Sequence, residues 1–339
     1  MIKIGLDGMG GDNAPQAVIE GAFIALAEYE NIEIHLYGQE EAMKPYLKEH
    51  PRLHIIHCEE VIDMNDDPAR AVRRKKDSSM ARMLDDAAAG NLDATLSAGS
   101  TGALMAGGLF KVGRIEGVAR PALATTLPTM DGKGFLMLDL GANADAKPEY
   151  IQQYAIMGDI YVKKVRGYEA PRVGLLNIGT EVKKGNELTK SAYELISQTP
   201  FNFIGNVEAR ELLNGAADVV VTDGFTGNMI LKTVEGTAMA MFGMLKDTFT
   251  ANTKSKLAYV LVKDGLKTIK NKMDYSEYGG AALFGLKSPV IKAHGSSNER
   301  AIFSAIRQAV MMVEHNVCAT IEETIASMAK VEESTNSEQ

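Results

Sequence analysis

The chain has 339 residues, enough for about two domains of ordinary size. Its 45% hydrophobic and 24% charged residues are typical of a globular protein with a sizeable core, which excludes a disordered, collagen-like or disulfide-stapled chain. Acidic residues number 44 and basic residues 36, so the formal net charge of -8 excludes an overall basic surface for nucleic acid. The two cysteines, Cys58 and Cys318, lie far apart and fit a reducing compartment.

No segment has the pattern of a membrane span. The longest stretch without a charged residue, 94–110, has 17 residues and includes four glycines, whereas a spanning helix needs about 20 mostly apolar residues. The N-terminal residues MIKIGLD predict a strand and lack the apolar core of a signal peptide. We therefore expect a cytoplasmic protein.

Short apolar runs alternate with helical patterns along most of the chain. Apolar residues recur about every 3.6 residues, as in a helix, most clearly at 17–27 and 150–165. This alternation predicts an α/β fold with a largely parallel sheet and helices on both faces. The predicted strands are 2–6, 32–37, 53–57, 94–97, 123–127, 135–138, 173–178, 203–207, 219–222 and 290–293.

The pattern changes after residue 222. From 227 to 273 no strand pattern occurs, which predicts two helices joined near 250–254. The final helix is predicted from Asn298 to about Lys330, with one apolar stripe that must dock on the sheet.

Six loops that follow predicted strands are rich in small polar residues. In a parallel sheet such loops gather at one edge, where ligands bind, so we expect these six to lie together. They are LDGMGGDNAP (6–15), SAGSTGA (97–103), LDLGANAD (138–145), NIGTEVKKGN (177–186), TDGFTGN (222–228) and KAHGSSNER (292–300).

Two of these loops, 97–103 and 292–300, have the composition of phosphate cradles. Glycine lets the backbone approach a ligand closely, and a helix N-terminus presents free N–H groups to an anion. The same Ser and Thr residues can instead cap helices, which is the commoner use of a single such loop. Several loops at one edge favour an anionic substrate. A classical nucleotide site is disfavoured, because Asn13 replaces the third glycine of a GxGxxG pattern and no P-loop occurs.

One histidine stands out by its position. His294 follows a predicted strand and precedes GSSN, where it can donate to an oxyanion, exchange a proton, or simply bond within the turn. The spacing of His35, His50, His54 and His57 does not match a metal-ligand pattern, and we interpret them as structural or surface residues.

Two further segments allow alternative uses. The run at 69–79 is a local basic patch, either a solvated helix face or a docking surface for an acidic partner or phosphate. The apolar run LAYVLV (257–262) is flanked by lysines. It either packs in a core or dimer contact, or presses into an anionic membrane surface without spanning it.

Taken together, these segments resemble the bacterial phosphate acyltransferases of phospholipid synthesis, which use acyl-acyl carrier protein and inorganic phosphate. Ser100 departs from the family pattern, which often has Asn in that position. The likeness extends over nearly the whole chain, through MGGDNAP (9–15), RRKKDSSM (73–80), SAGSTGA (97–103), LDLGAN (138–143), NIGTEVKKGN (177–186), TDGFTGN (222–228) and KAHGSSN (292–298).

The resemblance implies a homodimer with a fold similar to the isocitrate and isopropylmalate dehydrogenases and the phosphotransacetylases. One discontinuous domain would combine 1–148 with 282–339 and hold the phosphate and acyl site. The other, 149–281, would carry the dimer contact and a helical insertion at about 227–273.

The resemblance also implies the reaction. Phosphate would attack the thioester directly, so no cofactor and no metal are expected, and the acyl-phosphate would feed a membrane glycerol-phosphate acyltransferase. For catalysis our hypothesis is that Lys184 supplies positive charge to the phosphate and that His294 or nearby backbone N–H groups face the oxyanion. Phosphate binding is assigned to Ser100, Thr101, Gly102, Gly295, Ser296, Ser297 and Asn298, with Asp12, Asn13, Asn143, Asp223 and Asn228 in further active-site loops. Acyl carrier protein would dock on Arg73, Arg74, Lys75 and Lys76, and peripheral membrane contact would use Leu257, Tyr259, Val260 and Leu261.

Three other hypotheses stay open at this point. Cys58 or Cys318 could carry the acyl group, since thiolates perform such chemistry well. The chain could instead be an NAD(P)-dependent dehydrogenase of similar fold, which the missing third glycine disfavours. It could also be a non-catalytic acyl-binding scaffold, which the many polar loops disfavour.

Overall fold

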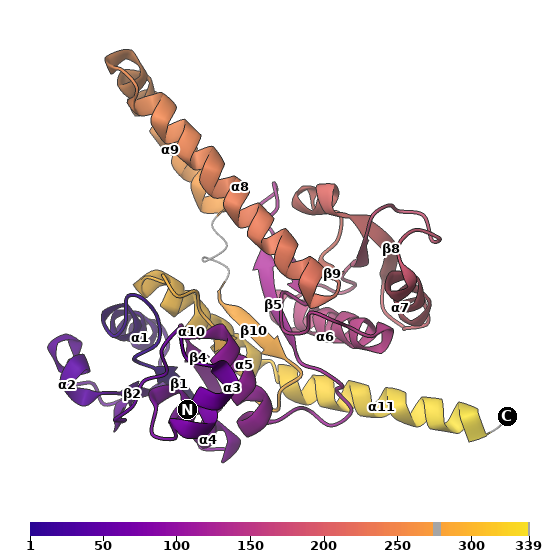
Figure 1. Ribbon diagram of the computed structural model, residues 1–339, viewed down its shortest axis with the longest axis horizontal. Helices are drawn as coiled ribbons and strands as arrows, with labels where there is room; N and C mark the ends of the chain where they lie inside the picture. Colours follow the sequence, from indigo (N-terminus) through magenta and orange to yellow (C-terminus); the bar gives the residue numbers. More distant parts are fainter. Residues whose placement is uncertain (274–278, 338–339) are drawn as a thin grey trace.

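The computed structural model describes residues 1–273 and 279–337, and it confirms the α/β fold (Figure 1). The strands of this part of the chain form one sheet in the order β3-β2-β1-β4-β11-β10-β5-β6-β9-β7-β8. Each of the ten predicted strands is present within one residue of its predicted bounds. The strands are β1 (Ile2–Asp7), β2 (Ile32–Gly38), β3 (Leu53–His57), β4 (Ala94–Ser97), β5 (Ala122–Leu127), β6 (Phe135–Leu138), β7 (Val173–Asn177), β8 (Phe203–Glu208), β9 (Val219–Val221), β10 (Ala281–Phe284) and β11 (Val290–Lys292).

Helices cover both faces of the sheet. Helices α1 and α10 pack together over β1, β2 and β4, so closely that a Cβ on Gly21 would lie 2.6 Å from Ile302; α4 packs on the opposite face. The helices are α1 (Gln16–Glu28), α2 (Glu40–Met43), α3 (Pro68–Arg74), α4 (Ser79–Ala88), α5 (Thr101–Gly107), α6 (Pro148–Arg166), α7 (Glu187–Ser197), α8 (Gly224–Thr250), α9 (Thr253–Met273), α10 (Glu299–Glu314) and α11 (Val317–Ser337), with short helical turns at Lys44–Tyr46, Gly108–Val112 and Ala209–Asn214.

The direction of the strands reverses in the middle of the sheet. Strands β3, β2, β1, β4 and β11 are mutually parallel, and β6, β9, β7 and β8 form a second parallel set. Between the sets, β10 pairs antiparallel with β11 and β5, and β5 pairs antiparallel with β6. The second set therefore runs opposite to the first. The loops at 138–145, 177–186 and 222–228 follow strands of the reversed set, so the six loops do not all follow strands of one direction as predicted. Four of them, 97–103, 138–145, 222–228 and 292–300, nevertheless supply residues to one cavity.

Two further elements differ from the predictions. β10 was missed, because its sequence AALF has little β-branched character and it pairs between two strands that are distant in sequence. The prediction of a single final helix was wrong as well. The segment forms two helices, α10 and α11, because Asn316 between them has a positive φ of 50° that interrupts the helix.

The predicted helical insertion is confirmed as a hairpin of α8 and α9 that projects from the body of the molecule (Figure 1). Among the described residues of α8, only Gly224 and Gly227 are buried. No helix in the described ranges is long and apolar enough to cross a membrane. The division into two domains stays a prediction. In the sheet, β6 of the predicted domain 1–148 plus 282–339 pairs with β9 of the predicted domain 149–281.

Candidate active site

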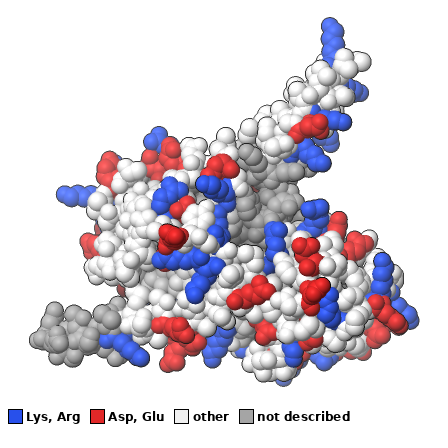
Figure 2. Space-filling model, turned by 180° about the vertical axis from the view of Figure 1, so that it is seen from behind, with Lys and Arg blue, Asp and Glu red and all other residues white. Residues whose placement is uncertain are grey.

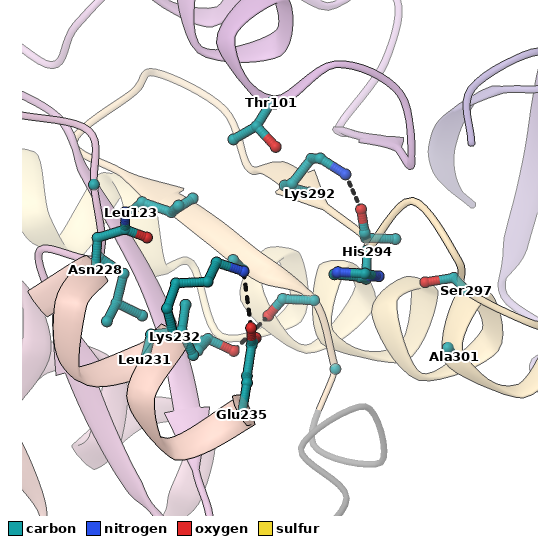
Figure 3. Close-up of a pocket in the computed structure, with 17 residues that line it drawn as sticks. Thr101, Leu123, Asn228, Leu231, Lys232, Glu235, Lys292, His294, Ser297 and Ala301 are labelled. Atoms are coloured by element: carbon teal, nitrogen blue, oxygen red, sulfur yellow. Dashed lines mark hydrogen bonds and ion pairs between the residues drawn. The ribbon is translucent and has the colours of Figure 1, made fainter. Parts of the chain in front are cut away.

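A cavity of about 350 Å³ lies against the middle of the sheet, where the strand direction reverses. Its wall comes from β5, β11 and the ends of α5, α8 and α10, so segments far apart in sequence meet there (Figure 3). Four predicted site residues line it, namely Thr101, Asn228, His294 and Ser297. The remaining lining residues are Leu123, Thr125, Leu140, Gly141, Leu231, Lys232, Glu235, Gly279, Gly280, Ala281, Lys292, Ala293 and Ala301.

Lys292 places a buried amino group in the cavity wall. It is the last residue of β11, and its Nζ donates to the backbone carbonyls of Ala98 and Ala293. Burial lowers the pKa of this amine to about 8, while the carboxylates of Asp7 and Asp12 act in the opposite direction. An ammonium has three N–H donors, so two backbone contacts leave one for an anion in the cavity.

Asp7 organises the loops that surround Lys292. Its carboxylate accepts hydrogen bonds from the hydroxyls of Ser79 and Ser97, each at 2.6 Å, and from the backbone N–H of Met9. The carboxyl is buried, and burial raises its pKa despite these hydrogen bonds. Asp7 thus ties the end of β1 to the start of the 97–103 loop.

The loop after β11 is held by the loop after β1. The Asn13 amide donates to the carbonyls of Ser296 and Ser297, and the Asp12 N–H donates to the carbonyl of Gly295 at 2.7 Å. Asp12 and Asn13 line a neighbouring cavity of about 480 Å³ together with Asn298. These two predicted site residues therefore shape the histidine loop from outside the main cavity.

The His294 ring has a defined hydrogen-bonding role. Its Nδ1 lies 3.2 Å from the Ser296 N–H, which can only donate, and 2.8 Å from the Ser296 hydroxyl. Nδ1 is therefore an acceptor, and the neutral ring carries its proton on Nε2. Among the described residues Nε2 has no hydrogen-bond partner, so its N–H can donate to a substrate oxygen.

The cavity combines apolar and polar surface. Figure 3 shows Leu123 and Leu231 on one side, with Asn228, and His294 and Ser297 on the other. Lys232 of α8 also reaches the wall, where its Nζ lies 2.8 Å from Glu235. The cavity therefore offers leucine side chains for an apolar chain and lysines for an anionic head.

Several predicted site residues have a role in the local fold. Ser100, Asp223 and Asn298 each cap a helix, accepting from the N–H of Ala103, Thr226 and Ala301 respectively. Gly102 allows close packing on α3, since a Cβ there would lie 2.8 Å from Pro68. Within the 97–103 loop, only Thr101 belongs to the described lining of the cavity.

The Asn143 side chain also forms hydrogen bonds within the fold. Its amide donates to the Pro121 carbonyl, the Asp139 carboxylate and the Tyr154 hydroxyl. Asp139 in turn accepts from four backbone N–H groups, those of Leu123, Gly141, Ala142 and Asn143. This network fixes the loop that carries Leu140 and Gly141 into the cavity.

Lys184 is not part of the described cavity lining. Its loop follows β7, in the reversed half of the sheet, and its Nζ lies 4.0 Å from Glu181. The structure therefore does not bring Lys184 together with His294 in this cavity, whose described lining contains the cations Lys232 and Lys292.

One lysine of the basic patch is held by neighbouring residues. Lys75 donates to Asp66 at 2.6 Å and to the Val61 carbonyl, and the hydrogen bond to Asp66 raises its pKa. The Arg73 guanidinium lies over the Phe110 ring, 4.7 Å from its centroid. Arg74 and Lys76 are exposed and form no ion pair with described residues, so they are the freer charges of the patch.

Neither cysteine has the surroundings of a nucleophile. Cys58 is fully buried, and desolvation raises its pKa to about 11. Desolvation likewise raises the pKa of Cys318 to about 12. Both thiols are therefore protonated at neutral pH, which argues against the acyl-cysteine hypothesis.

The sequence interpretation missed Lys292 and Asp7 as site residues. Each is the single charged residue at the carboxyl end of an apolar strand, IKIGLD or VIK. Buried charges are rare unless paired or functional, so a lone charge ending a buried strand was the available signal.

Comparisons with known proteins now place the chain in a family. A family model described as "Fatty acid synthesis protein" matches residues 2–320. A curated protein from Lysinibacillus sphaericus named "Phosphate acyltransferase" is 70% identical over 96% of this chain and 98% of its own length. One of the same name from Bacillus licheniformis is 60% identical over 97% of this chain and 99% of its own length.

Solved structures of lower identity share the fold. A phosphotransacetylase from Streptococcus pyogenes superposes with a TM-score of 0.61 at 16% identity, covering 92% of this chain and 94% of its own. A branched-chain phosphotransacylase from Enterococcus faecalis gives 0.60 at 15% identity, covering 93% of this chain and 100% of its own. The predicted likeness to phosphotransacetylases is confirmed, and the chain belongs to the fatty acid synthesis protein family, in its phosphate acyltransferase group.

Proposed function

We propose that the enzyme transfers a fatty acyl group from acyl-acyl carrier protein to inorganic phosphate. The observation that carries this proposal is the mixed lining of the cavity, which holds Leu123, Leu140 and Leu231 together with Thr101 and the buried Lys292. An acyl chain and a phosphate meet in the transition state of that reaction, and the apolar and polar residues of this lining suit them.

The chemistry requires no nucleophile from the protein. A phosphate oxygen attacks the thioester carbonyl carbon, and the carbon–sulfur bond then breaks with its electron pair leaving on sulfur. The proton of the phosphate hydroxyl ends on the thiol, so the products are acyl-phosphate and free acyl carrier protein. The protein contributes by holding the anion near the carbonyl and by stabilising the oxyanion.

Three residues receive roles in this scheme. The Lys292 ammonium and the Thr101 hydroxyl bind phosphate, and the His294 Nε2–H donates to the oxyanion. Support comes from their shared cavity wall and from the fixed ring orientation of His294. We propose that a membrane glycerol-phosphate acyltransferase then uses the acyl-phosphate as its substrate.

The direct test incubates the purified enzyme with acyl-acyl carrier protein and phosphate. We expect acyl-phosphate, trapped as a hydroxamate, together with a stoichiometric amount of free thiol. Acyl transfer to neither phosphate nor water would favour the acyl-binding scaffold, and reduction of NAD(P) with a hydroxy-acid substrate would favour the dehydrogenase.

His294→Ala is expected to lower kcat by about 10²-fold, because an oxyanion donor is lost from the cavity. The matched variant is Lys184→Ala, which removes a cation outside the described lining and is expected to keep near-wild-type activity. Steady-state rates of acyl-phosphate formation measure both. Equal losses in the two variants would contradict this assignment of roles.

Acyl carrier protein is expected to dock on the patch formed by Arg73, Arg74 and Lys76. Reversing the exposed charges with Arg74→Glu plus Lys76→Glu should raise the KM for acyl-acyl carrier protein about tenfold at low salt and leave the KM for phosphate unchanged. High salt should reduce the difference in this KM between the variant and the wild type. Lys164→Glu, an exposed reversal on α6, is the control, and the same effect there would rule out a specific docking patch.

We also propose that the chain forms a homodimer through residues 149–281 and touches membranes peripherally through the hairpin tip. Leu257, Val260 and Leu261 are 67%, 57% and 82% exposed. Figure 2 shows basic side chains at the end of the hairpin and further charged side chains along it, among uncharged surface. Leu261→Glu should abolish flotation with anionic vesicles and leave the dimer intact in sedimentation. Retained flotation would refute the membrane contact, and a monomeric variant would make the tip the dimer contact.

A further inference from the structure

Two neighbouring strands bring a carboxylate and two histidines together, far from the proposed active site. Glu33 and His35 are two residues apart on β2, so they lie on the same face of the sheet. In the parallel ladder His35 is in register with His54 of β3, which puts both rings side by side with centroids 4.9 Å apart. Sequence spacing did not reveal this cluster, because the register of two strands creates it.

Both rings face the same carboxylate. The His35 Nε2 lies 3.4 Å from Glu33 Oε1, and the His54 Nε2 lies 3.6 Å from Glu33 Oε2. One ligand atom from each residue falls within 4.8 Å of the others. A tetrahedral zinc ion, with bonds of about 2.0–2.1 Å, needs ligand atoms about 3.3 Å apart, so small side-chain rotations complete the geometry.

The surroundings are compatible with a bound cation. The Glu33 and His35 side chains are 18% and 23% exposed and His54 is 45% exposed, so the group is open to solvent on one side. Lys3 of β1, in register with Glu33, is the nearby positive charge. Its side chain is exposed on a flexible stem, which lets the ammonium turn away.

We propose that Glu33, His35 and His54 form a zinc-binding site, with solvent as the fourth ligand. Two imidazoles and one carboxylate are a donor set that favours zinc over magnesium or calcium. Glu33 and His54 each stand second in their strand, near the amino end, whereas the cavity lies beyond the carboxyl ends of β4 and β11. The site would fasten the edge strand β3 to β2 and take no part in acyl transfer.

Calorimetric titration of the tag-free full-length protein with zinc chloride tests this site. We expect one zinc per chain for the wild type and a higher melting temperature with zinc than with a chelator. His54→Gln and Glu33→Gln each remove one of three ligands and should weaken binding by at least about tenfold. Both should melt like the wild type in chelator, which shows that they fold.

His57→Gln is the matched control, because His57 also belongs to β3 and pairs with a single carboxylate, Glu59, at 3.0 Å. It should bind zinc like the wild type. The proposal is overturned if the wild type takes up no zinc, if His54→Gln and Glu33→Gln bind as tightly as the wild type, or if His57→Gln loses binding equally.

Discussion

Lys292→Ala is expected to lower kcat/KM for phosphate by about 10²–10³-fold, the usual loss when one preorganised charge partner of a reacting anion is removed. Lys292 is buried at the end of β11 and lines the cavity beside Thr101 and His294. Water cannot easily replace a buried ammonium, so the loss should be large. Initial rates of acyl-phosphate formation, measured over a range of phosphate concentrations, give the value.

Lys232→Ala is the matched control for this variant. Lys232 lines the same cavity, but its side chain is 57% exposed and paired with Glu235. Its charge is therefore largely screened, and its removal should lower kcat/KM for phosphate only a few-fold. Comparable losses in the two variants would show that a general positive field, rather than the Lys292 ammonium, binds phosphate.

The pH profile separates the charge of Lys292 from its shape. Burial lowers its pKa to about 8, so the ammonium form is present below that pH and is lost as the pH rises through it. The apparent KM for phosphate should then rise about tenfold per pH unit above about pH 8. Lys292→Arg, which stays charged throughout, should remove this pH dependence even though its kcat is reduced. A wild-type KM that stays flat up to about pH 9.5 would contradict the role of this amine.

Local pattern was sufficient to predict most of the fold. The ten predicted strands are apolar runs whose burial and β-branched content act over a few residues, so no knowledge of partners was needed. β10 depends on its partners β5 and β11, because its Ala281 and Ala282 have little strand preference of their own. The break at Asn316 was hidden because the apolar stripe continues from α10 into α11, with Val317 and Ile321 buried.

The candidate site was predictable only in part, for a related reason. A serine or asparagine before a helix looks the same whether it caps the helix or binds a ligand, and Ser100 and Asn298 are caps here. Which loops share a cavity depends on how the strands pair in the whole sheet, and the pairing at its centre involves β10, a strand that the pattern did not predict. Lys184 lies outside the described lining of the cavity, and Lys292 is a buried cation within it.

Gly227→Ala is expected to destabilise the protein by about 3 kcal/mol, an overpacking cost at the upper end of the usual range. A Cβ on Gly227 would lie 1.9 Å from the carbonyl oxygen of Asp139. Asp139 holds the loop that carries Leu140 and Gly141, so α8 and this loop would have to separate. The midpoint of urea unfolding, followed by circular dichroism, should fall, and acyl transfer should fall with it because Asn228 and Leu231 shift.

Gly236→Ala provides the control within the same helix. Gly236 also belongs to α8, but apart from its chain neighbours and the backbone of its own helix, no described atom lies within 4 Å of the position that its Cβ would take. Alanine is favoured over glycine in a helix interior by about 0.5–1 kcal/mol, so this variant should unfold at the same or a higher urea concentration. If the two variants unfolded alike, the close contact between the base of α8 and Asp139 would be refuted. A selective loss in Gly227→Ala instead means that the exposed hairpin and the cavity share one anchoring point, the first turn of α8.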